Sequence, residues 1–461
     1  MDIKIAESLK QIVGESFVID SPNEIEPYLY DETVPLLRPE ADRSSIVAIP
    51  ANTKEISEIM KLANRERISV VVRGGGTGLC GAAIPVHSSI IISMERLKKV
   101  IEVDDKNFVI TLESGVTLRE MQEYLRQNNN SFLFPSHSCD ENAQVGGMVA
   151  ENAGGIKSGK HGVMRNNVKG MEVVLATGEI LQLNGKLQKN NAGYDLMQLL
   201  IGSEGTLCII TKVMLRIVPR PKFGGTILVS FDNYGQATDA VTKVLKAGAT
   251  PIGIEYLDRT IAKKTADFLH DEWPLKKGKV DLLFVMAEES EDTIFNVCGI
   301  IEEICSEAGA VESVVFDGVE DQDRILRLRK SSYLATKSYL VDTLDITVPP
   351  ALIPQLMRGF NQIAEKYGVI FDTVGHVGDG NVHNNIYSEK NAIPQHYEEM
   401  KNELYQLGLT LGGTITGEHG IGKIRRKNLG MQLNDTQIAL MRGIKDLFDP
   451  NHILNIDTAI V

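Results

Sequence analysis

Short apolar runs alternate with amphipathic helical patterns from about residue 46 onward. Four of the runs are typical of buried strands: residues 45–50, 68–78, 88–94 and 108–115. The segment after the first run begins with Asn52, which can cap a helix, and carries Glu55 in its first turn. Ile56 and Ile59 then recur at helical spacing on one apolar face. The pattern predicts a first folded unit in which strands and helices alternate.

Two further segments complete this unit. Residues 168–183 contain two apolar runs around Thr177 and Gly178, which predicts a hairpin. Residues 206–222 predict a last strand that runs into the prolines at 219 and 221. Because proline interrupts a strand, we expect a domain boundary near residue 220.

Beyond residue 220 the pattern changes to strand, helix, strand over residues 225–258. Further strands are expected at 281–289 and 368–380, with a helix at 292–309 between them. This order predicts an α+β sheet with helices on one face. The chain ends in an amphipathic helical pattern and a tail within residues 433–461. We therefore divide the chain into residues 1–220, 221–410 and 411–461.

Composition and charge exclude several classes of protein. The net charge is −13, so the chain has no global basic character for nucleic acid or anionic membranes, and an anionic substrate would need a local positive site. The five cysteines contain no C-x-x-C pair, which argues against an iron–sulfur or zinc–thiolate cage and favours a reducing compartment. No run of 18 apolar residues occurs, and the first fifteen residues lack the apolar stretch of a secretion signal. We expect a cytoplasmic protein without membrane insertion.

Glycines gather in three clusters, at residues 74–81, 146–162 and 412–422. The first follows a predicted strand, so its backbone N–H groups could hold a diphosphate. Gly76, Gly78 and Gly81 match the G-x-G-x-x-G spacing, but no ribose-binding acid ends a second strand about 20 residues later. Glu95 is a poor substitute, which argues against a nicotinamide site. A tight glycine turn without any ligand remains an alternative.

The first cluster and residues 134–181 together resemble the flavoprotein family named after vanillyl-alcohol oxidase and p-cresol methylhydroxylase. The resemblance runs from about residue 40 to the C-terminus and is closest to the D-2-hydroxyacid dehydrogenase branch, which includes glycolate oxidase flavin subunits and D-lactate dehydrogenases. It implies an α+β fold: a two-subdomain FAD-binding domain (1–220), a substrate or cap domain (221–410), and a C-terminal segment (411–461) that returns to the flavin.

The resemblance also implies a set of FAD-binding residues. Glycines are reasonable there because a flavin packed against backbone leaves no room for side chains. Relatives that hold their flavin covalently carry the attaching histidine in this first loop. This chain has Gly76 at that position, so we expect non-covalent FAD. His137 and Cys139 are better interpreted as packed loop residues. The implied cofactor residues are Arg73, Gly74, Gly75, Gly76, Thr77, Gly78, Leu79, Pro135, Ser136, Gly146, Gly147, Asn152, Gly154, Gly155, Gly162, Glu204, Gly205 and Asn455.

Three of the nine histidines lie in two glycine-flanked motifs, GHVGDGNVH (375–383) and TGEHGIG (416–422). Two neutral imidazoles and a carboxylate form a common site for a divalent cation, and zinc, manganese and iron all fit. Two histidines alone would more often be hydrogen-bonded core residues. The resemblance implies His376, His383 and Glu418 as metal ligands and His419 as the base that takes the substrate hydroxyl proton.

The basic segment 324–350 resembles the family segment that binds the substrate carboxylate, and Arg329 aligns with the family's substrate arginine. Relatives that handle dicarboxylates carry a lysine where this chain has Thr343, although Lys337 lies near enough to replace it. This difference favours a small monocarboxylate as substrate. D-lactate, oxidised to pyruvate, is the first choice, and glycolate and 2-hydroxyglutarate are the alternatives. We interpret Arg324, Arg327 and Lys330 as a solvated helix face.

No second redox centre is evident, so an external acceptor must reoxidise the flavin. An electron-transferring flavoprotein is the leading hypothesis, and an iron–sulfur subunit is another. Three other functions compete with the dehydrogenase. A metallohydrolase would leave residues 71–207 unexplained, a non-catalytic flavin subunit would need no His419, and a neutral alcohol as substrate would leave Arg329 without a role.

Overall fold

The computed structural model describes residues 3–135, 140–388 and 392–459. Ser136, His137 and Cys139, named above, lie outside the described residues. Contacts along the chain divide it into two compact units. The first contains Met1–Gly154, Val163–Pro219 and Glu418–Val461, and the second contains Gly155–Gly162 and Arg220–Gly417.

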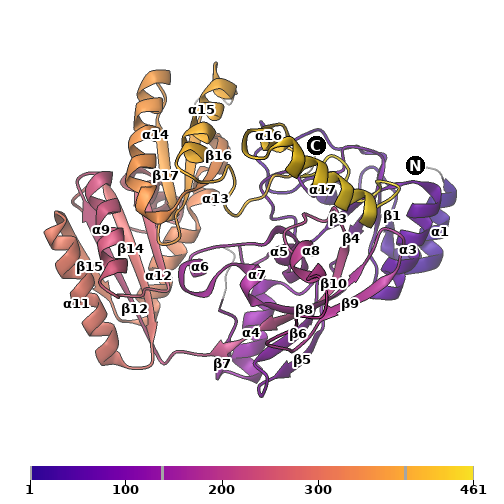
Figure 1. The fold of residues 1–461 in the computed structure, drawn as a ribbon, viewed down its shortest axis with the longest axis horizontal. Helices are drawn as coiled ribbons and strands as arrows, with labels where there is room; N and C mark the ends of the chain where they lie inside the picture. The colour runs from indigo at the N-terminus through magenta and orange to yellow at the C-terminus, as the bar shows by residue number, and fades with distance from the viewer. Residues whose placement is uncertain (1–2, 136–139, 389–391, 460–461) are drawn as a thin grey trace. The chain divides into compact units, whose positions relative to one another are not determined.

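A small, mostly parallel sheet begins the first unit. Its strand order is β1-β2-β4-β3, with β2 and β3 both parallel to β4 (Figure 1). The Asn52 cap is confirmed, since its side chain accepts from the backbone N–H of Glu55 at the start of α3. The elements around this sheet are α1 (Ile3–Val13), β1 (Val18–Ile19), α2 (Glu26–Leu29), β2 (Ile46–Ala48), α3 (Thr53–Glu66), β3 (Ser69–Arg73) and β4 (Ser89–Ser93).

A five-stranded antiparallel sheet of order β5-β6-β10-β8-β9 forms the rest of this unit. The predicted hairpin at 168–183 is confirmed: β8 pairs with β9, and Gly178 takes φ +88 in the turn. The elements here are β5 (Val100–Asp104), β6 (Val109–Glu113), α4 (Leu118–Asn128), β7 (Phe132–Leu133), α5 (Val145–Glu151), α7 (Met164–Asn167), β8 (Val168–Val174), β9 (Ile180–Asn184), α8 (Leu196–Leu200), β10 (Ile209–Arg216) and β11 (Val218–Pro219).

The C-terminal segment returns to the parallel sheet of the first unit. After α16 (Leu429–Gln432) and α17 (Asp435–Phe448), Leu454 forms an isolated parallel bridge with Val70 of β3. The backbone N–H of Val70 donates to Ile453 O at 2.7 Å, and that of Asn455 donates to Val70 O at 2.8 Å. The tail therefore extends the sheet beside the strand that leads into the first glycine cluster.

A seven-stranded antiparallel sheet dominates the second unit (Figure 1). Its strand order is β15-β12-β14-β13-β17-β18-β16. These strands are β12 (Phe223–Phe231), β13 (Gly253–Asp258), β14 (Val280–Glu288), β15 (Ala310–Phe316), β16 (Leu340–Thr347), β17 (Phe371–His376) and β18 (Asn381–Tyr387). The helices of this unit are α6 (Ser158–His161), α9 (Tyr234–Lys246), α10 (Arg259–Phe268), α11 (Glu291–Glu307), α12 (Val319–Lys330), α13 (Ser332–Thr336), α14 (Ile353–Tyr367) and α15 (Tyr397–Thr410).

Helices cover both faces of this sheet, so the prediction of helices on one face was wrong. Gly224 and Gly225 are consecutive residues of β12 and therefore point to opposite faces. A Cβ on Gly224 would meet Gln322 of α12, whereas a Cβ on Gly225 would meet Ile294 of α11. The pattern of α12 does not predict this packing, because its basic residues form a run that is typical of a solvated helix.

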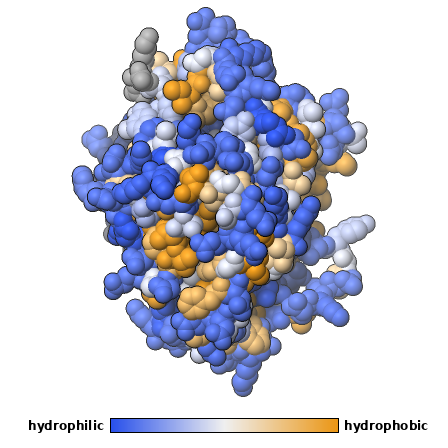
Figure 2. All heavy atoms as spheres, turned by 90° about the vertical axis from the view of Figure 1, so that its left-hand side faces the viewer, coloured by the Kyte–Doolittle hydropathy of each residue, from blue (hydrophilic) through white to orange (hydrophobic). Residues whose placement is uncertain are grey.

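Hydrophilic residues cover most of the face of the molecule shown in Figure 2. Figure 2 shows one face on which apolar residues lie in small groups among hydrophilic ones. Among the described residues, no helix is long and apolar enough to cross a membrane.

Candidate active site

The two predicted histidine ligands lie on neighbouring strands of the second unit. His376 ends β17, and His383 lies within β18, opposite Val374 in the antiparallel register. Both side chains are buried, and their ring centroids are 5.4 Å apart at an interplanar angle of 86°. The GHVGDGNVH motif is thus a strand, a tight turn and a strand, which brings its two histidines together.

Each histidine faces a buried carboxylate through its Nδ1 atom. Nδ1 of His376 lies 2.7 Å from Oε1 of Glu255, and Nδ1 of His383 lies 3.5 Å from Oδ1 of Asp345. Since an ionised carboxylate only accepts, Nδ1 of His376 is the donor, and the lone pair of the neutral ring lies on Nε2. Histidines that bind metals usually have such a carboxylate behind them. Sequence reasoning missed both Glu255 and Asp345.

Glu255 also contacts the predicted substrate arginine. Its Oε2 lies 2.6 Å from Nη2 of Arg329, which comes from the last turn of α12. Glu255 is fully buried on β13, and Arg329 is 4% exposed. Burial raises the pKa of the Glu255 carboxyl, but its interactions with His376 and Arg329 outweigh burial and leave that pKa below its ordinary value. An acid in the apolar run PIGIEYLD is the one sequence signal that could have identified this residue.

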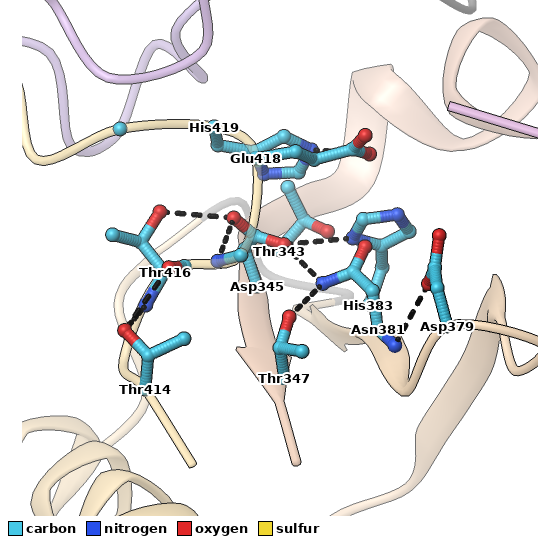
Figure 3. Close-up of polar contacts among 12 residues, drawn as sticks. Thr343, Asp345, Thr347, Asp379, Asn381, His383, Thr414, Thr416, Glu418 and His419 are labelled. Carbon is cyan, nitrogen blue, oxygen red and sulfur yellow. Dashed lines mark hydrogen bonds and ion pairs between the residues drawn. The ribbon is translucent and has the colours of Figure 1, made fainter. Parts of the chain in front are cut away.

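Asp345 joins the histidine strands to the next segment of the chain. Its Oδ1 accepts from the Asn381 side chain at 2.8 Å, and its Oδ2 accepts from the Thr416 hydroxyl at 2.9 Å and the Gly417 N–H at 2.8 Å (Figure 3). A Cβ on Gly417 would lie 2.0 Å from Oγ1 of Thr347, so only glycine fits there. Asn381 thus tethers the start of β18 to Asp345 of β16.

Glu418 and His419 follow Gly417 directly in the sequence. Within the second unit, His376 and His383 offer two imidazole ligands whose ring centroids are 5.4 Å apart, and the participation of Glu418 and His419 remains a prediction. Two imidazoles with carboxylates behind them and one further carboxylate fit zinc, manganese or iron. The predicted ligand set is therefore chemically sound, and the ion itself remains a prediction.

The other basic residues near Arg329 have different surroundings. Arg324 and Arg327 pair with Asp271 at 2.6 and 3.4 Å, and Arg327 is exposed. Thr343 is a buried residue of β16. Lys337 lies with its Nζ 6.0 Å from the ring centroid of Tyr333. Arg329 is thus the arginine of this segment that reaches the histidine cluster.

In the first unit, the glycine loop after β3 packs against the start of α5. A Cβ on Gly75 would lie 2.6 Å from Asn142 O, and one on Gly74 would lie 3.6 Å from Oε1 of Gln144. That Oε1 is buried and has no hydrogen-bond partner among the described residues. A Cβ on Gly147 would meet nothing within 4 Å. Open space over a glycine and a buried acceptor without a donor are both features of a cradle for a bound group.

Arg73 braces this loop. Its guanidinium donates to the carbonyl oxygens of Tyr30 at 2.9 Å and Pro27 at 3.1 Å. A Cβ on Gly76, which has φ +70, would lie 2.3 Å from Nη2 of Arg73. The side chain therefore fixes the loop from behind, while the backbone of residues 74–79 remains the part predicted to approach the diphosphate.

Asn455 and the 202–207 segment are tied to the same strand. Nδ2 of Asn455 donates to Glu204 O at 2.7 Å, and its Oδ1 accepts from Val72 N at 3.3 Å. The Glu204 carboxylate accepts from the N–H groups of Ile421 at 3.0 Å and Gly422 at 2.6 Å. Burial raises the pKa of Glu204, and these two bonds partly offset that effect. Asn455 and Glu204 thus hold three distant segments together.

The remaining predicted cofactor residues lie in both units. Gly146 is packed on Ser114, and Asn152, in the left-handed region at φ 53, accepts from Arg165 N at 2.9 Å. Gly155 and Gly162 belong to the second unit, whereas the predicted FAD-binding domain of residues 1–220 included them. The other predicted cofactor residues lie in the first unit, and their contact with FAD remains a prediction: Thr77, Gly78, Leu79, Pro135, Gly154 and Gly205.

Known families and relatives match most of the chain. Residues 44–184 match a family described as an FAD binding domain, and residues 220–457 match one described as the C-terminal domain of FAD linked oxidases. The D-lactate dehydrogenase of Archaeoglobus fulgidus is 38% identical over 93% of this chain and 94% of its own length. The glycolate oxidase subunit GlcD of Bacillus subtilis is 33% identical over 98% and 95%.

A solved structure shares the fold at low sequence identity. p-Cresol methylhydroxylase superposes with a TM-score of 0.79 over 99% of this chain and 96% of its own, at 16% identity. The fold prediction, a vanillyl-alcohol oxidase type FAD domain with an α+β second domain, is therefore confirmed. The chain belongs to the family of FAD-linked oxidases.

Proposed function

We propose that this FAD-dependent oxidoreductase oxidises a small D-2-hydroxy acid, with D-lactate to pyruvate as the favoured reaction. The observation that carries the proposal is one buried cluster in which Glu255 contacts both His376 and Arg329. A hydroxy acid needs both parts of such a site, since a cation and a base act on the hydroxyl while a guanidinium binds the carboxylate. A neutral alcohol would leave Arg329 without a function.

The metal ligands in this proposal are His376, His383 and Glu418. A divalent cation held there would orient the hydroxyl and carboxylate oxygens and lower the hydroxyl pKa. Fe²⁺, Mn²⁺ and Zn²⁺ suit this donor set equally. His376 and His383 are buried and Glu418 is half-buried, so their electrostatic interactions are stronger than they would be in bulk water.

Proton transfer is assigned to His419. Imidazole titrates near neutrality, so it can take the hydroxyl proton at the pH of a cell. Its neighbour Glu418 lies 3.8 Å away, close enough to stabilise the imidazolium that forms. The bound FAD, held without a covalent bond, would accept the hydride from the substrate α-carbon.

Substrate size rests on a weaker argument. Thr343 replaces the lysine that the family resemblance associates with dicarboxylates, and relatives similar to this chain are named D-lactate dehydrogenase and glycolate oxidase subunit. Both names denote small monocarboxylates. Glycolate is therefore the alternative to D-lactate, and 2-hydroxyglutarate ranks below both.

Electrons leave through a partner in this proposal. None of the described residues forms a second redox centre, so an external acceptor is required. An electron-transferring flavoprotein is the leading candidate, and an iron–sulfur subunit is the other. Rapid reoxidation of the reduced enzyme by a purified electron-transferring flavoprotein would support the first, and exclusive reaction with quinones would contradict both.

The test is the visible absorption spectrum of the anaerobic holoenzyme before and after each lactate enantiomer. We expect the oxidised flavin bands to bleach with D-lactate and to persist with L-lactate. Bleaching by glycolate alone would move the assignment to that substrate. Flavin bands that no 2-hydroxy acid bleaches, in protein loaded with metal, would contradict the proposed function.

A further inference from the structure

One buried carboxylate contacts two side chains that the proposed function assigns to different tasks. Glu255 lies within β13 at the centre of the seven-stranded sheet and is 0% exposed. We propose that Glu255 is a positioning residue that couples metal binding at His376 to recognition of the substrate carboxylate by Arg329. The proposal rests on the proposed function and extends it, because it assigns a role to a residue outside the predicted site.

The contact with His376 fixes both the tautomer and the ring plane. With Nδ1 donating to Oε1 of Glu255 at 2.7 Å, Nε2 is the atom that can bind a cation. A carboxylate in this position also increases the basicity of the ring. A loss of Glu255 would leave the ring free to rotate and to protonate on the wrong nitrogen.

The contact with Arg329 keeps a buried cation in place without using all of its donors. Nη2 lies 2.6 Å from Oε2 of Glu255, but the approach is that of an ion pair and does not meet hydrogen-bond geometry. Nε of Arg329 also has no hydrogen-bond partner among the described residues. Buried guanidinium donors usually have partners, so this arginine retains capacity for a further anion.

A second buried arginine–carboxylate pair in the same sheet shows the contrast. Arg259 binds Asp281 through Nε at 2.8 Å and Nη2 at 2.6 Å, and Trp273 donates to the same carboxylate at 2.9 Å. Asp281 is 0% exposed, as Glu255 is. This pair is complete without a ligand, whereas the pair of Glu255 and Arg329 is not. The difference indicates that a ligand completes the pair of Glu255 and Arg329.

Glu255→Gln tests the coupling because glutamine has the same shape but one acceptor oxygen. It can accept from His376 or from Arg329, and its amide group then faces the other. We expect the affinity of the FAD-loaded enzyme for Zn²⁺ or Mn²⁺ alone to fall about 10–100-fold. We also expect KM for D-lactate to rise about tenfold or more, with a smaller change in kcat.

Asp281→Asn is the matched control, since it disturbs an equally buried pair in the same sheet. It should lower the melting temperature and leave the metal affinity and KM unchanged. Glu255→Asp should restore part of the metal affinity, because it keeps two acceptor oxygens on a shorter side chain.

The outcomes separate this inference from the proposed function. A weaker metal affinity together with a raised KM supports the coupling. A change in only one of the two, or the same changes in Asp281→Asn, overturns it. A wild-type enzyme that binds the metal but oxidises no 2-hydroxy acid overturns the proposed function, and this result does not depend on any Glu255 variant.

Discussion

The glycine cradle of the first unit is formed by backbone, whereas the histidine cluster of the second unit is formed by side chains. The cradle is backbone: Gly74, Gly75 and Gly147 matter because they have no side chain. The cluster is made of His376 and His383 on paired strands, and each of these histidines faces a buried carboxylate. A flat cofactor needs room, whereas a proton transfer needs atoms held at defined positions.

The cradle is therefore expected to bind FAD, and the cluster is expected to carry out the proton transfer. Adding a methyl group should damage the cradle, and removing a polar atom should damage the cluster. Changes in the cradle should therefore alter FAD affinity, and changes in the cluster should alter turnover while FAD stays bound. Each variant below tests one side of that division.

The largest effect is expected for His419→Gln. Glutamine cannot take a proton, so the rate of flavin reduction by D-lactate should fall about 10²–10⁴-fold. FAD content and metal content should stay at wild-type values, as measured by absorbance and elemental analysis. A variant that reduces its flavin at the wild-type rate would remove His419 from the mechanism.

Gly417→Ala should act on the cluster through backbone position. The new Cβ would lie 2.0 Å from Oγ1 of Thr347 and 2.3 Å from Nδ2 of Asn381, which pushes the following residues away from Asp345. A displacement of about 1 Å can cost roughly 10²-fold in rate, so kcat/KM should fall by about that factor. Gly299→Ala is the control, since nothing lies within 4 Å of its Cβ and α11 gains a better helix former.

Two glycine substitutions separate folding from cofactor binding in the cradle. In Gly75→Ala the Cβ would lie 2.6 Å from Asn142 O, so unfolding of the apoprotein should become easier by about 1–3 kcal/mol. In Gly147→Ala the Cβ meets nothing within 4 Å, so the apoprotein should keep its stability. If FAD occupies the space over Gly147, its affinity should fall about tenfold, or about 1.4 kcal/mol. Unchanged FAD affinity in Gly147→Ala would contradict this placement.

Asn455→Asp should have the smallest effect. A carboxylate cannot donate to Glu204 O, where the amide now donates at 2.7 Å. The loss of one buried hydrogen bond should lower the free energy of unfolding by about 1–2 kcal/mol, measured by denaturant titration. Asn64→Asp, near the same C-terminal tail but in contact with Asn451, is a control that should change little.

Much of the fold was predictable because it follows from local patterns. The helix capped by Asn52, the hairpin at Gly178 and the strand that carries His376 all form as their sequences predict. The helices on both faces of the large sheet were not predictable, since the face that α12 covers depends on Gly224 and Gln322, which are 98 residues apart.

In the candidate site, too, the residues in short local motifs were predictable and those that depend on long-range packing were not. His376 and His383 lie together because the turn between β17 and β18 is short and flanked by glycines. Glu255 and Asp345 belong to strands whose sequences show only an acid in an apolar run, so their roles depend on strand pairing. The side chain of Arg73 donates to Tyr30 O and Pro27 O, contacts that the glycine motif does not predict, and its approach to the diphosphate stays a prediction.

The division of labour between cradle and cluster can be tested by removing the metal from the FAD-loaded enzyme with a chelator. The account predicts that the flavin bands persist, that D-lactate no longer bleaches them, and that Zn²⁺, Mn²⁺ or Fe²⁺ restores bleaching. Bleaching at the undiminished rate in metal-free enzyme, verified by elemental analysis, would contradict the account.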